Sequence, residues 1–279
     1  MPSNNYPAID ITSMADTKNA LHAYARLMGD WLKHCRAKRK HWWHASLRPS
    51  LNGLTTGVVY GAIDFEIDLN MRDSVLNVRT TTGQQFNKPL QGESAAQLQE
   101  NIKDFLVSCG LGEQSIPELP ADISDAEYAD YSPAQAKQLA DVLSSVTAAM
   151  TRLRADIREE TSPIQLWPHH FDLSMLWLPG NKVPDQDPDN EEHADKQMNY
   201  GFTFGDEGIP EPYFYTTAYP LPDALLTTPL PSGTTWRTEG FSGAVLLYKT
   251  LIENNKDPEN YLLMLWRSLF TAGQETMQN

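Results

Sequence analysis

The sequence predicts an α+β fold with a mostly antiparallel sheet and flanking helices. Several long segments carry an apolar residue every three or four positions, which is typical of helices with one buried face. Between them lie short segments in which apolar and polar residues alternate, separated by turn residues, which is typical of antiparallel strands. The chain has 279 residues, 41% of them hydrophobic, so it is long enough to bury a large core.

The first part of the chain, residues 16–110, is predicted to run helix, strands, helix. The apolar spacing predicts a helix over 16–35, followed by a basic stretch that suits the negative end of the helix dipole. Composition, alternation and turn residues predict strands at 41–48, 54–61, 62–70 and 74–83. A second helix is predicted over 93–109, closed by Gly110.

Residues 111–131 are predicted to be a polar connector, and residues 132–272 repeat the order helix, strands, helix. The predicted elements of this part are a helix at 132–159, strands at 162–178, 197–205 and 212–220, and helices at 241–253 and 257–273. The repeated order suggests an internal duplication of two halves packed into one compact body. The alternative is a single domain over 1–279.

The charge balance indicates which partners are unfavourable. Acidic residues outnumber basic ones by 36 to 22, so the net charge is −14. A field of that sign repels phosphate backbones and anionic lipids, so neither a nucleic acid nor a membrane is predicted as a partner. The start, "MPSNNYPAID", lacks the charged and apolar regions of a signal peptide. We therefore expect a cytoplasmic protein whose cysteines, Cys35 and Cys109, are reduced.

Two histidine motifs, "HWWH" at 41–44 and "HH" at 169–170, fall on predicted strands. Residues three apart on a strand face opposite sides, so His41 and His44 do not form a predicted metal pair. The period of two instead groups polar residues on one side of each predicted strand. These groups are His44, Ser46 and Arg48; Asp64, Glu66 and Asp68; Asn77 and Arg79; and His170, Asp172 and Ser174. Such faces are either the solvated side of a sheet or the lining of a cleft.

Two acidic loops follow in the second part of the chain. "PDQDPDNEEHADK", from residue 184, begins like a calcium loop, but Asn190 and Lys196 occupy the positions that need Gly and Glu. "GDEGIPEPYFY", from residue 205, places Asp206 and Glu207 between glycines and beside a strand of alternating tyrosines. Carboxylates beside an aromatic ladder can bind a ring or a cation, and the same ladder can be cross-strand packing.

Four stretches carry a resemblance to a known family: "HWWHASLRPSLNGLTTG", "FEIDLN", "LWPHHFDLSMLWLPG" and "NYGFTFGDEGIPEPYFYTTAYP". On these motifs the chain resembles the bacterial domain-of-unknown-function family numbered 5996 over residues 16 to 272. The resemblance implies a stand-alone cytoplasmic protein of this length. It implies no activity, cofactor or catalytic residue.

The expected function is binding of a small molecule in a polar cleft between the two halves. The first alternative is a hydrolase or lyase, with or without a metal ion. The second is an interaction protein without a catalytic site. The candidate catalytic residues are His44, Glu66 and Asp172, and the candidate ligand-binding residues are Arg48, Asp68, His170, Asp206 and Glu207. No cofactor, metal or oligomeric state is predicted.

Overall fold

The computed structural model of the chain describes residues 6–119, 123, 125–190 and 192–277, which form two compact units. The N-terminal unit comprises Ile9–Ser144 and Gln165–Phe171. The C-terminal unit comprises Met1–Ala8, Ser145–Ile164 and Asp172–Asn279, as far as these are described. One long helix, α3 (Pro133–Asp156), therefore contributes its first half to one unit and its second half to the other.

The N-terminal unit is built around a five-stranded antiparallel sheet with the order β1-β2-β3-β4-β5. Its other elements are α1 (Ala15–Cys35), η1 (Lys40–Trp42), α2 (Ala95–Ser108), η2 (Glu113–Ser115) and β7 (Gln165–Trp167). The strands of the sheet are β1 (Arg48–Pro49), β2 (Gly53–Thr55), β3 (Phe65–Asn70), β4 (Val75–Thr80) and β5 (Gln85–Pro89). The predicted helices at 16–35 and 93–109 are confirmed, and α2 begins with a capping box between Ser94 and Gln97.

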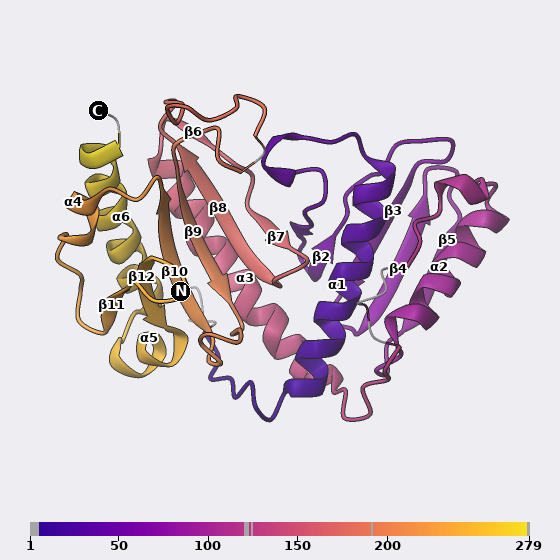
Figure 1. Ribbon diagram of the computed structural model, residues 1–279. Coiled ribbons are helices and arrows are strands. Elements are labelled where there is room, and N and C mark those ends of the chain that lie inside the picture. Colours follow the sequence, from indigo (N-terminus) through magenta and orange to yellow (C-terminus); the bar gives the residue numbers. More distant parts are fainter. Residues whose placement is uncertain (1–5, 120–122, 124, 191, 278–279) are drawn as a thin grey trace. The chain divides into compact units, whose positions relative to one another are not determined.

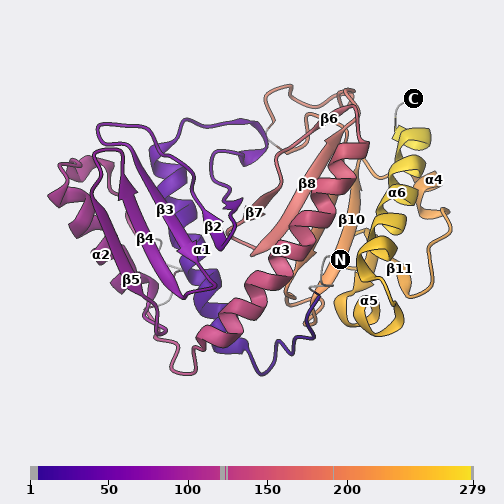
Figure 2. The same ribbon diagram turned by 180° about the vertical axis from the view of Figure 1, so that it is seen from behind.

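The alternation of β3 gives this sheet two different faces. Phe65, Ile67 and Leu69 are buried. The ring of Trp31 on α1 packs edge to face on the Phe65 ring, with the ring centroids 5.6 Å apart. Helices α1 and α2 cover this apolar face (Figure 1). Figure 2 shows the sheet from its other side, with β3 and β4 in front of α1. The intervening residues of β3 are only half-buried and point to this second face.

The C-terminal unit contains a second antiparallel sheet with the strand order β11-β12-β10-β9-β8-β6. Its strands are β6 (Glu160–Thr161), β8 (Asp172–Leu178), β9 (Gln197–Thr203), β10 (Tyr213–Tyr219), β11 (Thr234–Arg237) and β12 (Gly243–Leu247). Its helices are the second half of α3, α4 (Asp223–Leu226), α5 (Tyr248–Asn254) and α6 (Pro258–Met277). Helix α6 packs on one face of the sheet, where the rings of Phe270 and Trp177 pack edge to face with their centroids 5.0 Å apart. The predicted α+β class is therefore confirmed.

The predicted strand at 41–48 is wrong for most of its length. Lys40–Trp42 form the 3₁₀ helix η1, and only Arg48–Pro49 pair as a strand. His41 and Trp42 have φ angles of 54° and 55°. Such left-handed backbone ends an extended run, and aromatic composition does not reveal it. His44 therefore lies in a turn and not on a strand face with Arg48.

Three other predicted elements differ from the structure. Of the predicted strand at 54–61, only Leu54 and Thr55 belong to a strand, β2, and Val59 forms an isolated bridge with Phe65. The predicted strand at 162–178 is interrupted by a turn, in which the Phe171 N–H donates to the Trp167 carbonyl at 2.8 Å and Phe171 has a φ of 55°. The predicted helix at 241–253 begins as the strand β12, which pairs with β10 and β11, and becomes helical only at Tyr248. A short continuous apolar run such as "GAVLL" fits a buried strand and a buried helix equally well.

The two units have other boundaries than the predicted halves, 16–110 and 132–272 with a connector at 111–131. The division into these halves, the alternative of a single domain and the internal duplication stay predictions. Among the described helices, none combines the length and the apolar character that crossing a membrane requires.

Candidate functional site

A row of polar side chains crosses the face of the five-stranded sheet opposite α1 and α2. The register pairs Arg48 of β1 with Thr55 of β2. Thr55 is paired in turn with Asp68 of β3, and Asp68 with Asn77 of β4. Directly paired residues project to the same face, so the four side chains line up across four neighbouring strands. All four are half-buried. We call these four residues the polar row.

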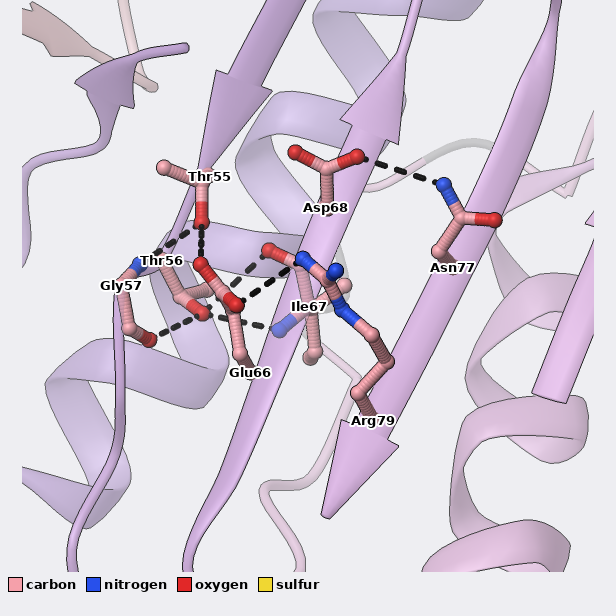
Figure 3. A network of polar contacts seen from close by, with 8 residues as sticks. All are labelled: Thr55, Thr56, Gly57, Glu66, Ile67, Asp68, Asn77 and Arg79. Carbon is pink, nitrogen blue, oxygen red and sulfur yellow. Dashed lines mark hydrogen bonds and ion pairs between the residues drawn. The ribbon is translucent and has the colours of Figure 1, made fainter. Parts of the chain in front are cut away.

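Glu66 lies beside the polar row and is fully engaged with protein groups. One carboxylate oxygen accepts a hydrogen bond from the Thr55 hydroxyl at 2.7 Å, and the other pairs with the Arg79 guanidinium at 3.0 Å. Figure 3 shows Glu66 between these two partners, with the Asp68 and Asn77 side chains alongside. Glu66 therefore orients Thr55 and is less available for an incoming molecule than Asp68.

Asp68 is the carboxyl group of the polar row, and its environment shifts its pKa. Burial raises its pKa above the ordinary value, and the hydrogen bond from the Asn77 amide at 3.2 Å and the charge of Arg79 offset only part of this effect. A carboxyl group with a raised pKa takes up a proton more readily, so Asp68 can accept or donate a hydrogen bond. A perturbed carboxyl group on a polar face is a marker of a functional site.

Arg48 stands at the end of the row and is also perturbed by burial. Burial and, to a smaller extent, the neighbouring cation Arg36 lower its pKa to about 10. Its Nη1 donates to the Ser46 hydroxyl at 2.8 Å and to the side-chain carbonyl oxygen of Gln165 at 3.0 Å. Both acceptors are neutral. Among the described residues, no carboxylate pairs with this guanidinium.

Gln165 is a residue of this site that sequence reasoning missed. It lies on β7, far from Arg48 in the sequence, and its side chain is 0% exposed. Leu47 and Leu166 exchange backbone hydrogen bonds of 3.0 Å, and this bridge brings Gln165 beside Ser46. No local pattern announces the pairing. The only signal in the sequence is a glutamine within an otherwise apolar strand segment.

His44, the first candidate catalytic residue, is buried in the turn after η1. Its Nδ1 accepts a hydrogen bond from the Arg39 backbone N–H at 3.1 Å, and its ring stacks on Trp42 with centroids 5.6 Å apart. This hydrogen bond places the proton of the neutral ring on Nε2. His44 therefore helps to fix the turn that precedes Arg48.

His170 is exposed in the turn between β7 and β8, and not on a strand face with Asp172 and Ser174 as predicted. Its ring lies 4.2 Å from the ring of His169, centroid to centroid. The backbone carbonyl of His169 contacts Nε2 of His22 on α1 at 3.2 Å. The His169 contact ties this turn to α1.

Asp172 belongs to the C-terminal unit and is buried in β8, where the prediction of a solvated polar face is wrong. Its carboxylate accepts a short hydrogen bond from the Tyr215 hydroxyl. Tyr215 reaches β8 by crossing β9 at Gly201, its direct partner in the register. A Cβ atom on Gly201 would lie 2.0 Å from Cζ of Tyr215, so only glycine leaves room for the ring. Burial raises the pKa of Tyr215, and the Asp172 charge raises it further.

Asp206 and Glu207 are exposed in the loop after β9. The Asp206 carboxylate accepts hydrogen bonds from the backbone N–H groups of Gly208 and Ile209 at 2.7 and 2.8 Å and from the Tyr213 hydroxyl at 2.5 Å. These contacts outweigh the effect of burial and lower the pKa of Asp206. Asp206 thus holds its own loop in shape, which is a structural role the sequence did not predict.

A separate pocket of about 230 Å³ lies in the N-terminal unit, at the C-terminal end of α1. It is lined by polar and apolar groups of the segments 59–65 and 111–115, together with the His34 and Cys35 side chains of α1. None of the predicted site residues lines it. Within the described part of the chain, no three His, Cys, Asp or Glu side chains are grouped so that they could hold one metal ion.

The eight predicted site residues are thus divided between the units. His44, Arg48, Glu66, Asp68 and His170 belong to the N-terminal unit, and Asp172, Asp206 and Glu207 to the C-terminal unit. Arg48, Glu66 and Asp68 project from one sheet face, whereas His44 and His170 lie in turns.

The fold and the site define the class: an α+β protein with two antiparallel sheets, one of which carries a polar row on the face opposite its helices. The chain belongs to the family described as "Family of unknown function (DUF5996)", whose model matches residues 6–278. The family resemblance in the sequence is therefore confirmed. No curated protein and no solved structure matches the chain.

Proposed function

We propose that this protein binds a small polar molecule at the polar row. The observation that carries the proposal is the register that aligns a guanidinium, a hydroxyl, a carboxyl and an amide across four strands of one sheet face. Small-molecule sites commonly combine a few convergent polar groups of this kind. The opposite face holds the apolar core, so the polar face is free to carry specificity.

The partial burial of the row supports the same proposal. Half-buried polar groups interact more strongly with a ligand than fully solvated ones, because less water competes for them. Glu66 is held by Thr55 and Arg79, whereas Asp68 has a raised pKa and accepts a hydrogen bond from the Asn77 amide at 3.2 Å. We therefore assign direct ligand contacts to Asp68, Asn77 and Arg48.

A second candidate function is acid–base chemistry on the bound molecule, with Asp68 as the proton-transferring group. The raised pKa of Asp68 favours this candidate, because a carboxyl group poised closer to neutral pH transfers protons more efficiently. Catalysis by His44, Glu66 and Asp172 stays a prediction, as do the cleft between the halves, the cytoplasmic location and the exclusion of nucleic acid and membrane partners.

The proposal is tested by a thermal-shift screen of the full chain against amino acids, organic acids, sugars and nucleotides, followed by calorimetry on the compounds that stabilise it. Asn77→Ala removes an amide of the row and Asp68→Asn removes its carboxylate charge. Each loses one or two ligand hydrogen bonds, so each is expected to weaken binding about tenfold to a hundredfold. Asp104→Asn removes one carboxylate from the exposed side of α2 and serves as the matched control.

Binding that is weakened by Asn77→Ala and Asp68→Asn, but unchanged in Asp104→Asn, supports the proposal. If compounds bind and all three variants bind them as tightly as the wild type, the polar row is not the site. Turnover of a bound compound that stops in Asp68→Asn, while binding persists, supports the second candidate function.

A further inference from the structure

We infer that Arg48, held in place by Ser46 and Gln165, forms a subsite for an oxyanion, a carboxylate or phosphate group of the bound molecule. This inference rests on the proposed function and deepens it by naming the charge of the ligand. It is carried by the Arg48 guanidinium at the end of the polar row, which is half-buried and uses one of its three nitrogens for hydrogen bonds with the described residues.

The donor of this subsite is the Arg48 guanidinium. Of its three nitrogens, only Nη1 makes hydrogen bonds with the described residues, to Ser46 and Gln165. The edge formed by Nε and Nη2 has no acceptor within the described part of the chain. This edge presents two parallel N–H groups, which match the two oxygens of a carboxylate or phosphate. Arg48 is only half-buried, so a solute can reach it.

The Gln165 side-chain amide orients this guanidinium. Because a guanidinium only donates, the oxygen of this amide must face Arg48. The same oxygen accepts a hydrogen bond from the Ser46 hydroxyl at 2.9 Å, and Gln165 is 0% exposed. Ser46 and Gln165 therefore hold Nη1 in place and leave the edge formed by Nε and Nη2 for an incoming oxyanion.

The part of the sequence that contains Arg48 is basic. Residues 31–63 contain six Lys or Arg residues and no Asp or Glu, although 36 of the 279 residues of the chain are acidic. Arg36, the cation whose charge acts on Arg48, also donates only to neutral groups, the carbonyls of Thr56 and Val58 at 2.7 and 3.1 Å. Two neighbouring arginines that, among the described residues, donate only to neutral oxygens favour a small anion here despite the net negative charge of the chain.

The position of the subsite defines the ligand further. Arg48 and Asp68 are both paired with Thr55, so two strand spacings, about 9.6 Å, separate their backbones. The structure records no interaction between these two side chains. The ligand is therefore a small polar molecule with an oxyanion at one end and a hydrogen-bonding group that reaches Asp68 and Asn77 at the other.

The plainer alternative is that Arg48 only ties the β1 region to β7 through Ser46 and Gln165. Both roles use the same two hydrogen bonds, but only the subsite requires saturable anion binding. Titrating the wild-type chain with inorganic phosphate and, separately, with sodium acetate distinguishes them. Sodium chloride keeps the ionic strength constant, so general screening is removed from the comparison. The readout is nuclear magnetic resonance of the backbone and arginine side-chain N–H groups.

We expect saturable shifts with at least one of the two anions, centred on Arg48, Ser46 and Gln165. Arg48→Gln and Arg48→Lys, which lose the forked donor, are expected to bind that anion at least about tenfold more weakly. Arg158→Gln removes one cation from an exposed position and is the matched control. Saturation by phosphate alone assigns a phosphate ligand, and saturation by acetate alone assigns a carboxylate ligand. If both anions saturate the site, the tighter of the two assigns the class.

Absence of saturable shifts in the folded wild-type chain overturns the inference, whether or not the Arg48 variants fold. So does anion binding that Arg158→Gln weakens as much as Arg48→Gln. The inference and the proposed function fail separately. A neutral compound whose binding depends on Asn77 but not on Arg48 leaves the function standing and refutes the anion subsite. If an anion binds at Arg48 but no compound of the screen shows binding that depends on Asp68 or Asn77, the anion subsite stands and the proposed function is refuted.

Discussion

Replacing Gly201 with alanine is expected to disrupt the hydrogen bond between Tyr215 and Asp172 in the C-terminal unit. The new Cβ would lie 2.0 Å from Cζ of Tyr215, which is far too close for two atoms that are not bonded, so the ring must leave its place over β9. The buried Asp172 then loses a donor to its charge, at a cost of about 1.5 to 3 kcal/mol. Overpacking adds a cost of about 1 to 3 kcal/mol.

The expected loss is therefore about 2.5 to 6 kcal/mol in the free energy of unfolding, within a total of about 5 to 15 kcal/mol for a typical protein. Urea unfolding followed by circular dichroism measures it. Gly61→Ala is the matched control, because the nearest atom to its Cβ would be the Ile63 carbonyl oxygen at 3.8 Å. This control should change stability by less than about 0.5 kcal/mol.

A second background isolates the cause. In a Tyr215→Val protein the ring is absent, so adding Gly201→Ala should cost less than about 1 kcal/mol, because contacting residues are not additive. An equal cost of Gly201→Ala with and without the Tyr215 ring would refute the reasoning. So would a Gly201→Ala protein as stable as the wild type.

The remaining predictions concern titration and thiol reactivity. Burial raises the pKa of Asp68 in the folded state above the unfolded pKa of about 3.9. Between these two pKa values the folded state binds more protons than the unfolded state, so the stability contributed by this group falls as the pH rises through the folded pKa. Asp68→Asn should therefore flatten this decline in the free energy of unfolding. The net pKa of Asp206 is lowered, so its contribution is present above the unfolded pKa and is lost as the pH falls through the folded pKa; Asp206→Asn should change the slope in the opposite direction. Slopes that change in the same direction would contradict this account. Burial raises the pKa of the Cys35 thiol, so in a Cys109→Ser protein iodoacetamide should alkylate Cys35 more slowly in the native state than in urea. Mass spectrometry of timed samples measures both rates, and equal rates would show that Cys35 is not protected.

Much of the fold followed from local patterns, and the exceptions have identifiable physical causes. The strict alternation of "FEIDLN" predicted β3 and both of its faces, and helix periodicity predicted α1 and α2. The strand predicted at 41–48 failed because His41 and Trp42 adopt left-handed backbone, which residue type does not reveal. The strand predicted at 162–178 is interrupted for the same reason, because Phe171 also adopts left-handed backbone.

The candidate site was predictable only in part. Glu66 and Asp68 were placed correctly on one polar face because the period of two is a local property. Gln165 could not be predicted, because its partnership with Arg48 depends on a bridge between distant strands. Asp172 was predicted on a polar face because the sequence does not show that Tyr215 crosses Gly201 to bury it.

The most direct test of the central claim is a crystallographic fragment screen of the full chain with small polar compounds, including carboxylates and phosphates. The account predicts density for bound fragments on the sheet face between Arg48 and Asn77, with an oxyanion on Arg48. Fragments that bind only elsewhere, such as in the pocket beside Cys35, or a polar row that stays without fragments throughout the screen, would contradict it.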